Sequence, residues 1–329
     1  MQIPYWETQQ WKDKKKIRHI SNVMGWANFG VQALMVGLMM AYQWILLTIG
    51  YPFRMDLTAS GGMSSTMYYF LVSAVYIVAV ALPFILCIAF MKLPVNETFP
   101  FQKVGIGWGV LWILFGVGFC MLTNIPANVV AILIESMGFS GTLPESVVPN
   151  TPLALVLNII EIAVIPPLVE ELAFRGVILS QLRKYGNGLA VFGSALLFAF
   201  YHGNFLQFTF TFFVGLILGF IMIRTNNLWI PIIIHALNNG LSLFFSLAAD
   251  HMSNQAYEVM NVLLFYGLMV VGFVAFIVLL LKKRDCFQRH FQQGLLLFSD
   301  RVIAFFTNPG FLAFFALFVL TAVASLKNW

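Results

Sequence analysis

The sequence predicts an all-α polytopic transmembrane helix bundle with about eight to nine spans. Of its 329 residues, 60% are hydrophobic and only 9% are charged, whereas a soluble globular domain carries about 25% charged residues. A chain this apolar can expose its surface only where much of the solvent is lipid. Because apolar stretches cover nearly the whole length, we expect a single membrane domain over residues 1–329.

The apolar stretches define the individual spans. A transmembrane helix needs roughly 20 apolar residues to cross a hydrocarbon core about 30 Å thick. The least distinct pair lies between residues 188 and 224, where two short spans meet without a clear loop. The expected spans are 24–49, 67–93, 105–124, 152–171, 188–206, 207–224, 228–249, 257–281 and 303–326.

A proline pair interrupts the fourth of these stretches. Pro166 and Pro167 lack backbone N–H groups, and a proline inside a helix also clashes with the preceding turn. We therefore expect the helix to break there and a second helix to run from about 167 to 184.

The distribution of charge predicts the orientation in the membrane. Residues 1–23 form a basic segment before the first span, and cytoplasmic loops are enriched in Lys and Arg. An N-terminus inside also places Arg183, Arg224 and Lys282 inside, while the 139–151 and 249–256 loops, which have no Lys or Arg, lie outside. The first apolar stretch is too long for a signal peptide and lacks a small-residue cleavage site, so we expect it to be retained.

The cysteines and a second basic segment give little further information about function. Cys87, Cys120 and Cys286 are far apart and form no metal-binding spacing, so we interpret them as small hydrophobic residues. The segment 282–293 is basic and partly amphipathic, as is typical of an interfacial stretch. Few cysteines, a basic N-terminus and no organelle signal favour a bacterial plasma membrane.

A small group of ionisable residues lies deep within the apolar stretches. Charged groups in lipid are costly and usually functional, although buried polar groups can also serve only to hydrogen-bond helices together. All of the deep ones fall between residues 161 and 235. They are Glu161, Glu170, Glu171, His202 and His235.

The spacing of these residues favours a convergent site. Glu171 and Arg175 are four apart, which places them on one helical face as a pair, whereas Glu170 points about 100° away. Phe198 and His202 share the same spacing, so the phenyl ring can fix the pose of the imidazole. His235 and Asn239 repeat it on another helix. Three such pairs on successive helices predict one polar site inside the bundle.

The chemistry that suits this set is hydrolysis of an amide bond. Glu170 and one histidine can hold and deprotonate a water, while the other histidine and the Asn239 amide donate to a developing oxyanion. No HExxH motif occurs, and every aspartate flanks a span or lies in a loop, which excludes an intramembrane aspartyl dyad. Ser194 lies about 12 Å along the same helix from His202, too far to form a catalytic pair.

The motifs EELAFR at 170–175, FAFYH at 198–202 and HALNN at 235–239 resemble those of the CAAX protease and bacteriocin-processing family. That family shows EExxxR, FxxxH and HxxxN in this order on successive helices, and its members look like type II CAAX prenyl endopeptidases. The resemblance covers roughly residues 150–250, which we interpret as the catalytic core.

The resemblance implies an intramembrane endopeptidase acting on a membrane-tethered peptide or protein in the lipid bilayer. It implies that Glu170 and His202 activate the water and that His235 and Asn239 stabilise the oxyanion. Glu171 and Arg175 would order the site, with Phe198 in support. Nothing in the sequence points to a nucleic-acid partner. Bacterial substrates of this class would be peptide leaders, pheromone precursors or bacteriocins.

Alternatives remain on mechanism and function. The family has been described both as metalloproteases and as metal-independent glutamate proteases, and Glu170, His202 and His235 are the ligand types of a zinc site. We favour the form without a cofactor, because no ligand pair has a local zinc-binding spacing. A non-catalytic scaffold on the same fold is a second alternative, and a transporter lined by Glu161 and Asn158 is a third.

Overall fold

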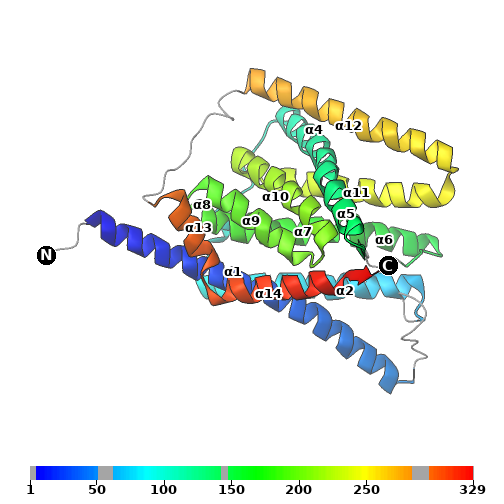
Figure 1. The fold of residues 1–329 in the computed structure, drawn as a ribbon, viewed down its shortest axis with the longest axis horizontal. Coiled ribbons are helices and arrows are strands. Elements are labelled where there is room, and N and C mark those ends of the chain that lie inside the picture. The colour runs from blue at the N-terminus through cyan, green and yellow to red at the C-terminus, as the bar shows by residue number, and fades with distance from the viewer. Residues whose placement is uncertain (1–4, 51–61, 142–146, 284–295, 329) are drawn as a thin grey trace.

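The computed structural model describes residues 5–50, 62–141, 147–283 and 296–328, and it is built almost entirely of helices (Figure 1). The larger helices are α1 (Tyr5–Thr48), α2 (Ser65–Met91), α4 (Ile106–Leu122), α5 (Asn124–Ser136), α6 (Pro152–Ala163), α9 (Asn187–Tyr201), α10 (Phe205–Thr225), α11 (Trp229–His251), α12 (Asn254–Lys282) and α14 (Pro309–Ala324). The shorter ones are α3 (Val95–Thr98), α7 (Ile165–Glu171), α8 (Leu179–Arg183) and α13 (Phe298–Phe306), with a π-helix, η1 (Leu172–Ile178).

The predicted fold class is confirmed. Among the described residues, 7 helices are long and apolar enough to cross a membrane, or up to 8 if the bent pair α13–α14 forms one span. The only strands in this part of the chain are β1 (Phe139–Gly141) and β2 (Leu326–Asn328), which pair antiparallel. The protein is therefore an integral membrane protein with a helical bundle.

Two predicted spans differ from the helices observed. The stretch 188–206 contains α9, which has 15 residues and ends at Tyr201. The stretch 303–326 is divided between α13 and α14, whose axes differ by 70°. The division has a local cause: Asn308 caps α14 by accepting a hydrogen bond from the Phe311 amide at 2.9 Å, and Pro309 starts that helix.

The structure describes most of the predicted basic segment 1–23 but little of the predicted basic segment 282–293. Within the predicted segment 1–23, the residues from Tyr5 onward are helical and continuous with the first span in α1. Most of the segment 282–293 lies outside the described residues, as does Cys286. Its predicted interfacial position therefore stays a prediction.

The helices are arranged in three groups (Figure 1). The central group contains α7, η1, α9, α10 and α11, with α9 packed along α10 and α11 against α7. On one side of it lie α1, α2 and α14, and on the other lie α4 and α12, which pack closely on each other. The spans that flank the predicted catalytic core in sequence thus enclose it in space.

The crossing of α1 and α14 is close enough to require glycine on both helices. A Cβ atom added at Gly25 would lie 2.2 Å from the Gly310 carbonyl carbon, and one added at Gly310 would lie 2.1 Å from the Asn22 carbonyl oxygen. The Asn22 side chain accepts a hydrogen bond from the Gly310 amide at 2.7 Å. Small residues that let two backbones approach in this way are typical of helix packing in membranes.

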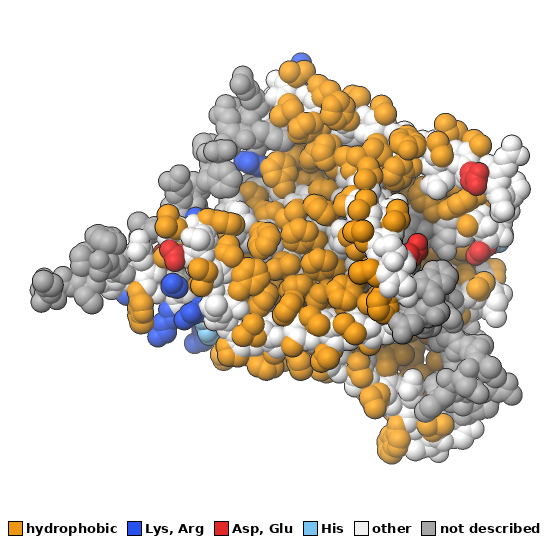
Figure 2. All heavy atoms as spheres, in the orientation of Figure 1, with side chains coloured by type: hydrophobic (Ala, Val, Ile, Leu, Met, Phe, Trp, Pro, Cys, Tyr) orange, Lys and Arg blue, Asp and Glu red, His pale blue; other side chains and the backbone are white. Residues whose placement is uncertain are grey.

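The outer surface matches a lipid environment. Figure 2 shows hydrophobic side chains over the middle of the visible face, with most Lys and Arg side chains near the end where α1 begins. Many large apolar side chains are exposed, including Ile106 at 88% and Trp44 at 67%. Exposure on this scale is costly in water but not in lipid.

Candidate active site

The predicted break at the proline pair is present and presents the first motif to the bundle interior. The helix α6 ends at Ala163 and α7 begins at Ile165, two residues before the predicted start. Prolines in the first turn of α7 lose no hydrogen bond, because the first amides of a helix have no partner within it. The break thus brings Glu170 and Glu171 to the end of a short, newly oriented helix.

The break leaves the Ile162 carbonyl without its helical donor, and the Asn239 side chain donates to it instead. In a continuous helix the amide of residue 166 would donate to the Ile162 carbonyl, but Pro166 has no N–H. Instead, Nδ2 of Asn239 donates to that carbonyl oxygen at 3.1 Å. Asn239 therefore ties α11 to α6, a contact that its motif position alone does not predict.

The predicted pair Glu171–Arg175 is confirmed. Nη1 of Arg175 donates to Oε1 of Glu171 at 2.8 Å, and both side chains are 0% exposed. Arg175 lies in the π-helix η1, a rare element that is often found at functional sites. Its guanidinium also stacks over the Phe198 ring at 4.5 Å, so this buried cation has partners on two sides.

Glu171 also orients His235. Nδ1 of His235 lies 2.9 Å from Oε1 of Glu171. Because an ionised carboxylate can only accept, Nδ1 carries the proton and donates it. This contact fixes the ring and directs Nε2 toward Glu170, with 3.8 Å between Nε2 and Oε2 of Glu170.

Glu170 is held from the opposite side by a residue that lies outside the three motifs. The Tyr76 hydroxyl, on α2, donates to Oε1 of Glu170, and the Tyr201 hydroxyl donates to the Tyr76 oxygen at 2.9 Å. Oε2 of Glu170 is buried without a hydrogen-bond partner among the described residues. The sequence predicts a role for neither tyrosine, since their contacts with the motif residues are long-range or follow no helical spacing.

His202 lies at the end of α9, in the turn that separates it from α10. Its Nδ1 donates to the Phe198 carbonyl at 2.9 Å, so Nε2 of the neutral ring keeps its lone pair. The predicted packing of Phe198 on this imidazole is confirmed, with ring centroids 4.9 Å apart. Gly203 makes the turn with φ +61°, a conformation that L side chains rarely adopt.

One cavity gathers these side chains. It has a volume of about 200 Å³, and Glu170, His202, His235 and Asn239 all contribute to its wall. The remaining lining residues are Glu161, Ile162, Pro166, Phe198, Phe210, Thr211, Val214 and Asn238. All four residues predicted as catalytic therefore meet at one place inside the bundle, while Glu171 and Arg175 lie behind them.

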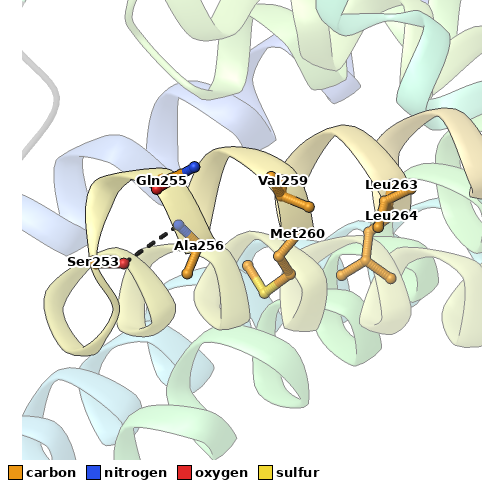
Figure 3. A pocket seen from close by; sticks show the side chains of 7 residues that line it. All are labelled: Ser253, Gln255, Ala256, Val259, Met260, Leu263 and Leu264. Carbon is orange, nitrogen blue, oxygen red and sulfur yellow. Dashed lines mark hydrogen bonds between the residues drawn. The ribbon is translucent and has the colours of Figure 1, made fainter.

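A larger hollow lies elsewhere and has a different character. It measures about 650 Å³ and is lined by α12 between Ser253 and Leu264, mostly with apolar side chains (Figure 3). The Ser253 hydroxyl caps the helix by accepting a hydrogen bond from the Ala256 amide at 3.4 Å. This hollow has no ionisable side chain in its lining, so it offers no group for acid–base chemistry.

The side chains in this cavity are of types that can bind metals, but their arrangement is not that of a metal site. Among the described residues, no three His, Cys, Asp or Glu side chains are close enough together to hold a metal ion. Glu170, His202 and His235 share a cavity, but in this arrangement they do not form a ligand set that fits zinc. We therefore derive no chemical step through a metal.

Comparisons with known proteins find similarity to membrane peptidases. The sequence model of the family described as "Type II CAAX prenyl endopeptidase Rce1-like" matches residues 152–241, which contain all three motifs. The "Membrane-embedded CAAX protease MroQ" of Staphylococcus aureus (strain USA300) is 30% identical over 163 residues, which cover 46% of this chain and 63% of that protein.

The "Putative membrane peptidase YdiL" of Bacillus subtilis (strain 168) is 24% identical over 147 residues, 44% of this chain and 60% of that protein. The chain thus spans about three fifths of the length of these curated relatives. No solved structure matches it. Residues 152–241 of this chain are therefore similar to the CAAX protease family and to these membrane proteins.

Proposed function

We propose that this protein is an intramembrane endopeptidase that hydrolyses a peptide bond of a membrane-tethered peptide or protein. The observation that carries the proposal is that Glu170, His202, His235 and Asn239 line one cavity within the segment that matches the protease family. The bacterial origin of the relatives supports a bacterial plasma membrane, and the basic start of α1 supports a cytoplasmic N-terminus.

In the proposed mechanism, Oε2 of Glu170 takes one proton of a water as the water oxygen attacks the scissile carbonyl carbon, while the other O–H of that water donates to Nε2 of His202. A general base in this position typically contributes about 10²–10⁴-fold to the rate. The proton on Glu170 then passes to the amine nitrogen as the C–N bond breaks, which restores the base. Both acceptors are available, because Oε2 of Glu170 has no hydrogen-bond partner among the described residues and Nε2 of His202 keeps its lone pair.

His235 and Asn239 are the proposed donors to the oxyanion. In this proposal His235 acts as the imidazolium: Nδ1–H donates to Glu171, and Nε2–H donates to the developing negative charge. Asn239 has a second N–H besides the one that is donated to the Ile162 carbonyl. Both side chains line the cavity beside Glu170, where the scissile carbonyl would lie.

The test is cleavage by the full-length protein in proteoliposomes. The substrate is a library of fluorescence-quenched peptides, each with an acyl chain that anchors it to the bilayer. We expect cleavage of a subset of these peptides, and loss of that cleavage when Glu170 is changed. A folded wild-type protein that cleaves no peptide in the library would favour the non-catalytic scaffold instead.

We predict that this cleavage survives removal of metal ions. The proposed base and donors act without a metal, so prolonged chelation should leave kcat unchanged, and purified protein should contain no stoichiometric zinc. The measurement is cleavage before and after chelation, together with elemental analysis of the same sample. Chelator-sensitive cleavage that zinc restores would contradict this prediction and would make Glu170, His202 and His235 the candidate ligands.

We predict that Asn239→Ala lowers both kcat and stability. Loss of one oxyanion donor typically reduces kcat by about 10²–10³-fold. Loss of the bond to the Ile162 carbonyl leaves that partly buried oxygen without this donor, which costs at most about 1–3 kcal/mol. Cleavage per folded molecule and thermal unfolding, measured on the same detergent-purified protein, separate these two effects.

Asn227→Ala is the matched control, since Nδ2 of Asn227 also donates to a distant carbonyl, that of Gln102, at 2.6 Å. Asn227 does not line the cavity, so its loss should affect unfolding and leave cleavage per folded molecule near wild type. If both variants lose stability and neither loses kcat, Asn239 is a tether alone.

A further inference from the structure

A chain of two tyrosine hydroxyls leads to the carboxylate proposed as the base. Tyr201, on α9, donates to Tyr76, on α2, and Tyr76 donates to Oε1 of Glu170, on α7. Tyr76 lies 94 residues before Glu170 and outside the matched segment 152–241. Tyr76 lies outside all three motifs, and Tyr201 occupies a variable position of the FxxxH motif.

The chemistry of the groups fixes the direction of the chain. An ionised carboxylate only accepts, so the single hydroxyl proton of Tyr76 goes to Glu170. The Tyr76 oxygen is then left to accept, and it takes the proton of Tyr201. Such a bond to a charged acceptor is stronger than a neutral one, and a second donor behind it strengthens it further.

Tyr201, the first donor in this series of hydrogen bonds, is itself held in place by neighbouring residues. Nε2 of Gln32, on α1, donates to the Tyr201 carbonyl at 2.6 Å. Tyr201 is buried, with 7% of its surface exposed, and its ring packs on that of Phe174 at 5.5 Å. The hydroxyl that orients Tyr76 is therefore itself held in place.

We infer that Tyr76 is a positioning residue for Glu170. By occupying Oε1, it holds the carboxylate in one rotamer and leaves Oε2 as the oxygen that takes the proton from water. Oε2 is the Glu170 oxygen that has no hydrogen-bond partner among the described residues, and Nε2 of His235 lies 3.8 Å from it. Tyr201 acts one step further away, by orienting the Tyr76 hydroxyl.

The inference rests on the proposed function and extends the active site beyond the matched segment. The family match covers α6 to α11, but one of the contacts that set the geometry of the base comes from α2. A role in packing alone is the competing explanation, because the same hydroxyl also joins α2 to α7. The two explanations differ in whether kcat or only stability depends on that hydroxyl.

The experiment uses Tyr76→Phe in the full-length protein, reconstituted with one acyl-anchored peptide that the wild type cleaves. We expect kcat to fall by about 10–100-fold, the usual effect of losing a group that orients a functional residue. KM should change by less than about twofold, because the hydroxyl does not line the cavity. Tyr201→Phe should show a smaller loss of kcat of the same kind.

Tyr69→Phe is the matched control on the same helix. Tyr69 is buried and its hydroxyl donates to the Val147 carbonyl, remote in sequence from Glu170. The Tyr69→Phe variant loses a buried tyrosine hydrogen bond on α2 but no contact with Glu170, so it should keep the wild-type kcat. A loss of kcat in Tyr69→Phe as large as that in Tyr76→Phe would overturn the inference.

A double variant completes the test. If Tyr201 acts through Tyr76, adding Tyr201→Phe to Tyr76→Phe should lower kcat no further. An equal additional loss in both backgrounds would contradict the role of Tyr201, and a wild-type kcat in Tyr76→Phe while Glu170→Gln is inactive would overturn the inference. In these outcomes the proposed protease function stands. Absence of cleavage by the folded wild type would instead refute the proposed function and, with it, the inference.

Discussion

Glu170→Gln is expected to abolish measurable peptide cleavage while the protein remains folded. Glutamine has nearly the same shape and can still accept the Tyr76 hydrogen bond, but it cannot take a proton from water. Loss of a general base typically lowers the rate by about 10²–10⁴-fold. The measurement is kcat in proteoliposomes, with thermal unfolding of the same preparation to show that the bundle is intact.

The control for this variant is Glu161→Gln. Glu161 is the other acidic residue that lines the cavity, and no described residue hydrogen-bonds to it or pairs with it. Its change removes the same charge from the same cavity but leaves Glu170 in place. We expect kcat to fall far less than in Glu170→Gln. If the two variants lost activity equally, the loss would reflect the charge of the cavity rather than a specific base.

Arg175→Ala is expected to have the largest effect on stability. Arg175 and Glu171 are both 0% exposed, and the substitution leaves a buried carboxylate without its cation. Breaking a buried ion pair from one side costs about 3–5 kcal/mol. The guanidinium also fills space over the Phe198 ring, so packing is lost as well. Thermal unfolding in detergent and the yield of folded protein measure this effect.

A second substitution, Glu171→Gln, should partly restore the stability that Arg175→Ala removes. Glu171→Gln in the Arg175→Ala background removes the stranded charge and still offers an oxygen to Nδ1 of His235, so stability should rise again. Lys14→Ala is the surface control, because the Lys14–Asp300 pair is 3.7 Å apart and 39% exposed on each side. Such exposed pairs contribute about 0–1 kcal/mol. A fully stable Arg175→Ala protein would contradict the structural role of the pair.

The fold class and the motif residues could be predicted because they depend on local properties of the chain. Hydropathy identifies apolar helices from about 20 consecutive residues, and helical spacing places Glu171 beside Arg175 and Phe198 beside His202. The proline pair marks the break before Glu170, because a proline cannot donate to the preceding turn. These features need no knowledge of which helices are neighbours.

The remaining contacts could not be predicted, because they join helices that are distant in sequence. The Tyr76 and Glu170 side chains are 94 residues apart, and Nδ1 of His235 reaches Glu171 across 64 residues. Tyrosines in apolar spans are common, and nothing in the sequence near Tyr76 distinguishes it from Tyr68 or Tyr69. The π-helix at Leu172–Ile178 also has no residue pattern that predicts it.

The glycine crossing of α1 and α14 has a consequence for the biosynthesis of the bundle. The Gly310 amide and the Asn22 side chain are 288 residues apart, so nearly all of the other spans are translated between the two helices. During translation, the face of α1 around Gly25 can contact lipid or other helices, but it has not yet met α14. The side of the bundle formed by α1 and α14 therefore closes late, after the motif helices have already entered the membrane.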